Sequence, residues 1–182
     1  MKELLLKLKA CGLAIDWAGD KTIEEIWETC HRGDWMLWLA RKLNIDKRVL
    51  TIAKGHCANT VRHLMKDERS IAAVDMAIKY GEGNATDTEL AAAYAAAYAA
   101  DASSAAAYAA YAAAYAAAYA AAAYAADAYA ADAYSADAYA YAAAYAARKQ
   151  SQQATAEICR KYIPLELILA AIKSQEKQKD GI

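Results

Sequence analysis

The chain has 182 residues and a formal net charge of −1, so no global electric field attracts nucleic acid or an anionic membrane. One proline and seven glycines are too few for a loop-rich or all-β protein, which needs frequent turn residues. Charged residues interrupt the apolar start of the chain, and no stretch of large apolar residues is long enough for a membrane span. With four scattered cysteines, this pattern predicts a cytoplasmic all-α protein with reduced thiols.

Three regions differ in composition, and we expect them to form one helical domain over residues 1–182. Residues 1–85 have a mixed globular composition, whereas residues 86–147 are almost entirely alanine and tyrosine with a few Asp and Ser. Residues 148–182 return to a mixed, charged composition. The large aliphatic residues lie mainly in the first and third regions, so the two ends of the chain are expected to build the conventional core.

Helical spacing of apolar residues predicts a series of helices in the first region. The first runs from Glu3 to Cys11, and Gly12 is expected to end it. The capping box Thr22-Ile-Glu-Glu25 opens a second helix. We expect Gly33 to end this helix and Asp34 to cap the next one.

Signals for three further helices follow along the chain. A helix covers about residues 71–80 and ends at Gly81-Glu-Gly83, and Pro164 suits the first turn of a last helix. Before them, Asp46 can cap a helix whose expected buried stripe is Val49, Leu50, Ala53, Cys57, Val61 and Leu64.

A second capping box, Thr86-Asp-Thr-Glu89, opens the Ala/Tyr region, where alanine is the strongest helix former. The tyrosines share one helical stripe as far as Tyr119, but the next four, from Tyr124 to Tyr139, recur every fifth residue and cannot share one face of a straight helix. We therefore expect several helices, with breaks near residues 101–104 and near Asp127. The tyrosine rings would fill the gaps between alanine ridges, or alternatively form a face for protein recognition.

The predicted fold is thus all-α: a multi-helix bundle or short α-solenoid with closely packed Ala/Tyr-rich central helices. One rival is a β-helix, because three Ala-Asp-Ala-Tyr units over residues 126–140 are similar to pentapeptide repeats. Three units are few, and alanine stands where a stacked coil needs a larger inward residue. The helical interpretation is therefore favoured.

Half of the chain shows a recognisable order of motifs. The motifs are Ile26-Trp-Glu-Thr-Cys30, Arg32-Gly-Asp-Trp35-Met-Leu-Trp38-Leu, His56-Cys-Ala58, Asp67-Glu-Arg69 and Gly81-Glu-Gly-Asn-Ala-Thr86, followed by the Ala/Tyr run. This order resembles the Ala/Tyr-rich immunity protein family of bacteria and phages, although Ser70 stands where family members carry proline. The resemblance implies a helical protein that neutralises a toxin or another antagonist by binding it.

Arg32-Gly33-Asp34, followed by Trp35 and Trp38, has two interpretations. As a recognition surface, Arg32 would be a bidentate donor and the tryptophans would anchor a protein interface. As a structural element, Gly33 would end one helix, and Asp34 would cap the next while pairing with Arg32. The pattern alone favours the structural interpretation.

A modest basic face is the other candidate site; its residues are Lys54, His56, Arg62, His63, Lys66 and Arg69. It suits an acidic partner or a nucleotide phosphate, or it is a solvated helix face. His56 and His63 carry zinc-binding atoms, but they lie seven residues apart rather than at the close spacing of zinc ligands. We therefore expect no metal and no cofactor.

The sequence contains no P-loop, dinucleotide-binding glycine turn, H-E-x-x-H or G-x-S-x-G motif. We therefore expect no enzyme, but a protein that neutralises a toxin or defence factor by stoichiometric binding. A small-ligand binder or sponge for nucleotide-like molecules, and a helical module that forms homo-oligomers, are the alternatives. Neither a membrane nor a nucleic acid is an expected partner. The candidate binding residues are Arg32, Asp34, Trp35, Trp38, His56, Arg62 and His63.

Overall fold

The computed structural model describes residues 1–102 and 133–180, and every regular element in these ranges is helical. The elements are α1 (Lys2–Lys7), α2 (Gly12–Ala18), α3 (Ile23–Thr29), α4 (Gly33–Lys42), α5 (Lys47–Asn59), the 3₁₀ helix η1 (Arg62–Leu64), α6 (Glu68–Gly81), α7 (Asp87–Ala102), α9 (Ala133–Tyr162) and α10 (Leu165–Asp180). The all-α prediction is confirmed. The β-helix rival is wrong for residues 133–140, which lie in α9. Among the helices described, none combines the length and apolar character needed to cross a membrane.

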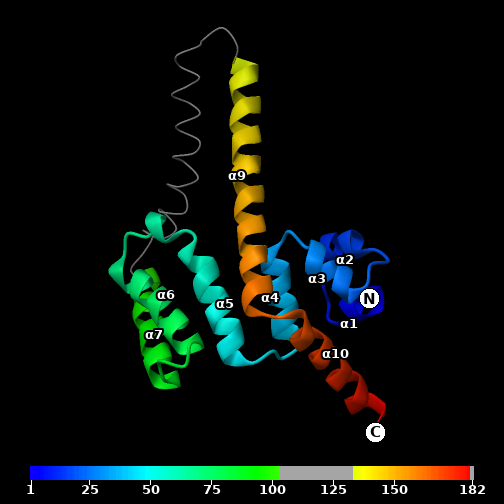
Figure 1. Ribbon diagram of the computed structural model, residues 1–182. Coiled ribbons are helices and arrows are strands. Elements are labelled where there is room, and N and C mark those ends of the chain that lie inside the picture. The colour runs from blue at the N-terminus through cyan, green and yellow to red at the C-terminus, as the bar shows by residue number, and fades with distance from the viewer. Residues whose placement is uncertain (103–132, 181–182) are drawn as a thin grey trace.

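Helix α9 organises the arrangement (Figure 1). Its 30 residues extend over about 45 Å, and its first half projects beyond the other labelled helices. Its second half packs against both α4 and α5. Helices α6 and α7 lie on the outer side of α5, and α1, α2 and α3 lie on the opposite side of the molecule. After Pro164 the chain turns into α10, which contacts α3.

The main core joins both ends of the chain, as the distribution of aliphatic residues predicted. Leu5 of α1, Ile26 and Trp27 of α3 and Leu39 of α4 belong to the same buried cluster as residues of α9 and α10. The largest side chains that are completely buried all come from the last region of the chain: Cys159, Ile163 and Ile168. The third region therefore supplies the centre of the core rather than an arm beside it.

The first predicted helix is wrong in its extent. Helix α1 ends at Lys7, because Lys9 adopts a left-handed conformation with φ of 60° and stops the helix there. Gly12, expected as a helix end, is instead the first residue of α2. The sequence prediction missed α2 because glycine was interpreted as a stop signal.

The expected roles of Gly33 and Asp34 also need correction. Helix α3 ends at Thr29, and Gly33 is the first residue of α4 rather than the end of α3. Arg32 occupies the N-cap position of α4 without a side-chain cap, so Asp34 lies inside the first turn and does not cap the helix. The predicted pairing of Asp34 with Arg32 is present in the structure.

The cap signals further along the chain are confirmed, but one buried stripe is not. Asp46 accepts hydrogen bonds from the backbone amides of Arg48 and Val49 at the start of α5. Because α5 ends at Asn59, Val61 and Leu64 lie beyond it and are 38% and 54% exposed instead of buried.

Helix α7 begins the Ala/Tyr region at its predicted capping box. The Thr86 hydroxyl accepts a hydrogen bond from the Glu89 amide at 3.3 Å, and the Glu89 carboxylate accepts one from the Thr86 amide at 2.8 Å. Tyr94 on this helix is 46% exposed, so it is not a core residue. The predicted break near Asp127, residues 103–104 of the other predicted break, and most of the tyrosine stripe lie outside the described residues.

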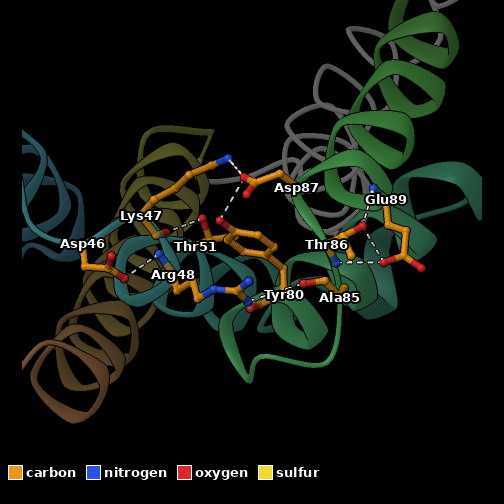
Figure 2. A network of polar contacts seen from close by, with 9 residues as sticks. All are labelled: Asp46, Lys47, Arg48, Thr51, Tyr80, Ala85, Thr86, Asp87 and Glu89. Carbon is orange, nitrogen blue, oxygen red and sulfur yellow. Dashed lines mark hydrogen bonds and ion pairs between the residues drawn. The ribbon is translucent and has the colours of Figure 1, made fainter.

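A polar network holds α5 against the connection between α6 and α7 (Figure 2). The Arg48 guanidinium donates hydrogen bonds to the carbonyl oxygens of Tyr80, at 2.6 Å, and Ala85, at 3.4 Å, and lies 4.3 Å from the centre of the Tyr80 ring. The Tyr80 hydroxyl donates to Asp87, which also pairs with Lys47. Arg48 thus satisfies two carbonyls where the chain leaves α6.

Replacing Arg48 tests this role. Arg48→Met keeps the apolar stem but leaves both carbonyls without their charged donor, so unfolding should become easier by about 2 kcal/mol. Lys47→Met is the matched control, because its ion pair with Asp87 is mostly exposed to solvent and should contribute little. Urea denaturation followed by circular dichroism measures both variants; equal losses would contradict the assignment.

Helices α4 and α9 lie very close together at Gly33. A Cβ atom placed on Gly33 would lie 2.6 Å from the carbonyl carbon of Thr155 and 2.7 Å from its Cβ, closer than real contacts allow. Only glycine therefore permits the two helices to pack at this distance.

We predict that Gly33→Ala destabilises the fold by about 2 kcal/mol, because the added methyl group overpacks the junction with backbone atoms. Gly12→Ala is the matched control: it is also the first residue of a helix, and its added Cβ meets no atom within 4 Å. Thermal unfolding should separate the two variants, and similar melting temperatures would show that the junction can relax.

Candidate binding face

Two tryptophans and a histidine form an aromatic cluster at the junction of α2 and α4. The Trp17 and Trp35 ring centres are 6.0 Å apart with planes inclined by 56°. The His31 ring meets Trp17 edge-on, at 6.0 Å and 78°. All three side chains are half-buried, so each keeps part of its ring accessible to solvent. The edge-on and tilted arrangements of these rings are favourable aromatic contacts.

Three cations lie over tryptophan rings around this cluster. The Arg32 guanidinium is 4.5 Å from the ring centre of Trp35, Lys21 is 4.8 Å from Trp17, and Lys42 is 5.9 Å from Trp38. Lys21 also donates a 2.6 Å hydrogen bond to the Trp17 carbonyl. Cations near aromatic faces are attracted to the π electrons, which restrains both partners before anything binds.

Arg32 is held on both sides. Its Nε and Nη2 atoms donate to the two carboxylate oxygens of Asp34, at 2.8 and 2.5 Å, while the guanidinium plane lies over Trp35. The hydrogen bonds from Arg32 lower the pKa of Asp34 and raise the pKa of Arg32. Asp34 is 58% exposed. The sequence pattern Arg-x-Asp-Trp therefore gives a preorganised, charged edge beside the aromatic cluster.

An apolar cleft opens between α1, α2, α3 and α4 next to these rings. Its wall includes all four tryptophans of the chain, Trp17, Trp27, Trp35 and Trp38, together with Leu5 and Met36. We call this cleft, with the Arg32–Asp34 pair beside it, the tryptophan face. Trp17 and Trp27 were not predicted as site residues, although the apolar spacing Ala14, Trp17 and Ala18 after Gly12 indicates a helix face that could have revealed Trp17.

The other three predicted site residues do not join the tryptophan face. Within the described part of the chain, no hydrogen bond, ion pair or ring contact links His56, Arg62 or His63 to it. Arg62 forms a bidentate ion pair with Asp75 of α6, with an Nη2–Oδ2 distance of 2.9 Å, and His63 is exposed. The predicted basic face is thus partly neutralised by carboxylates.

His56 contacts a different element. Its ring stacks on Tyr162 of α9 with a centre-to-centre distance of 4.4 Å and planes 8° apart. Partial burial, followed by the positive charge of Lys161, lowers the pKa of His56 below 6.5, whereas Glu82 opposes the shift. The folded state therefore disfavours the imidazolium, and His56 contributes stability above pH 6.5 that is lost as the pH falls through its folded pKa.

We predict that Lys161→Gln raises the pKa of His56, because it removes the nearby positive charge. Nuclear magnetic resonance titration of the imidazole protons measures the shift. Lys2→Gln, at the start of α1, should leave the titration of His56 unchanged. If Lys161→Gln also leaves it unchanged, burial alone sets the pKa.

The cysteines were also considered as metal ligands and as reactive thiols. No group of three or more His, Cys, Asp or Glu residues in the described ranges is placed to hold a metal ion. Burial raises the pKa of the Cys30 thiol, and contact with the Cys57 thiol together with burial raises that of Cys159. Reactive cysteines need a lowered pKa and solvent access, so Cys30 and Cys159 have the properties of structural thiols.

No family model, curated protein or solved structure matches this chain. The resemblance to immunity proteins therefore stays a prediction from the motifs, and functional interpretation depends on the tryptophan face itself.

Proposed function

We propose that this protein acts by stoichiometric binding of a toxin or defence factor through the tryptophan face. The observation that carries the proposal is the contact of Trp17 with Trp35 and of Trp35 with Arg32, in which large half-buried rings and a bidentate arginine are already fixed in place. Tryptophan and arginine are the residue types most enriched at energetically dominant positions of protein interfaces. Preorganised side chains lose little conformational entropy on binding.

The shape of the face favours a protein partner over a nucleotide-like ligand. The enclosed volume of the cleft is about 30 Å³. Small-molecule sites typically have volumes of roughly 300–1,000 Å³, so the volume of this cleft is far below their range. The flanking residues are accessible: Leu13, one turn before Trp17 in α2, is 73% exposed, and Asp34, which pairs with Arg32, is 58% exposed. A protein surface can cover such a face as a whole, and steric exclusion then suffices for neutralisation.

Capture from a lysate of the source organism tests the proposal. The wild-type protein should retain one macromolecule at a fixed molar ratio, and Arg32→Ala should weaken this binding about thirtyfold, as expected for a dominant interface residue. Arg69→Ala is the matched control, since Arg69 also pairs locally with an aspartate, Asp67, at the start of a helix. Binding by Arg69→Ala should equal that of the wild type.

Two results would refute the proposal. One is an equal loss of binding in both arginine variants, which would place the interface elsewhere. The other is retention of no macromolecule, combined with turnover of a small substrate that stops when His56 or His63 is replaced. Both results are read from the same purified variants.

A further inference from the structure

The cleft of the tryptophan face has a wall of almost uniform chemistry. Its lining residues are apolar apart from the indole nitrogens and the Cys30 thiol, which is directed to the Arg32 carbonyl at 3.5 Å. A water molecule needs roughly 10–15 Å³ of such space and several polar partners. The 30 Å³ of inner space therefore fits two groups of methyl size, and the wall favours aliphatic rather than polar ones.

One of the residues that line the cleft, Trp27, carries a buried polar atom without a partner. Trp27 is 2% exposed, and its Nε1–H is buried without a hydrogen-bond acceptor among the described residues. The main chain around it is fixed, because Arg160 of α9 donates to the carbonyl oxygens of Trp27 and Cys30, at 3.2 and 2.9 Å. Buried indole N–H groups normally find a partner, so an acceptor supplied by a ligand would remove the free-energy cost of leaving this N–H group without a hydrogen bond.

Two exposed leucines follow or precede lining residues of the cleft in the chain. Leu6 and Leu13 are 55% and 73% exposed, and they adjoin the lining residues Leu5 and Ala14 in the chain. Leu13 precedes Trp17 by one helical turn and therefore shares its side of α2. Exposed leucines beside half-buried tryptophans extend the contact area past what a small solute covers, which favours a polypeptide as the ligand.

We propose that the cleft binds a leucine-type side chain of the partner polypeptide, and that a peptide carbonyl beside this side chain accepts a hydrogen bond from Trp27 Nε1. The two methyl groups of the side chain fill the inner space, and the adjacent backbone lies against Leu13 and Trp17. This inference rests on the proposed function, and it specifies the chemistry that the partner must present.

A capped amino acid tests the site without knowledge of the partner. N-acetyl-leucine methylamide carries the branched side chain and two amide carbonyls, whereas N-acetyl-glycine methylamide carries only the carbonyls. The four indole N–H resonances are followed in ¹⁵N-labelled protein, and Trp27→Phe assigns one of them. The leucine compound should shift the Trp27 resonance downfield and saturably at millimolar concentration, and the glycine compound should bind at least about tenfold more weakly.

Two variants with the same substitution make the test specific. Ala14→Leu places a side chain into the cleft and should abolish the saturable shift. Ala72→Leu, at an exposed position of α6, should retain it. The proposal is overturned if the wild type shows no saturable shift, if the glycine compound causes the same shift, or if Ala14→Leu still responds.

The test also separates this inference from the proposed function. Capture that depends on Arg32, without a response to the leucine compound, would refute the cleft assignment and leave the binding function standing. A response to the leucine compound without capture of any macromolecule would support the cleft assignment and refute the binding function. Sedimentation showing a dimer that Leu13→Glu abolishes, with the Trp27 resonance shifting as the dimer forms, would overturn the proposal in favour of a second copy as the occupant.

Discussion

The close approach of α9 to the first residue of α4 is the contact on which the described fold depends. Gly33 leaves room for the Thr155 backbone, the Cys159 thiol is directed to the Gly33 carbonyl at 3.5 Å, and Arg160 donates to two carbonyls at the end of α3. The stretch of α9 from Thr155 to Arg160 therefore fixes both the end of α3 and the start of α4. Arg32 and Trp35 lie directly at this junction, so the third region of the chain positions residues of the first.

Local signals were sufficient for three of the predicted helix caps, although not for Asp34. Thr22, Asp46 and Thr86 were predicted as caps, and each accepts the expected amide hydrogen bond. Gly12 and Gly33 were interpreted wrongly, because glycine marks helix ends and close contacts equally well. The role of Gly33 is set by Thr155, far away in the sequence, and no pattern around Gly33 contains that information.

The candidate site was predictable to a similar extent. The Arg32–Asp34 pair is only two residues apart, so its spacing alone suggested the contact. The cleft could not be inferred in this way, because Trp17, Trp27 and Trp35 come from three helices whose relative placement depends on packing. His56 was assigned to a basic face by its neighbours in the sequence, yet its stacking on Tyr162 comes from the contact between α5 and α9.

The continuity of α9 has a mechanical consequence. One helix runs without interruption from Ala133, in the Ala/Tyr region, to Tyr162, in the core. Backbone hydrogen bonds along its length make such a helix stiff. A force or rotation applied to its projecting turns is transmitted to Thr155 and Arg160 instead of being absorbed locally. The projecting first half of α9 and the geometry of the tryptophan face are therefore linked through a single rigid helix.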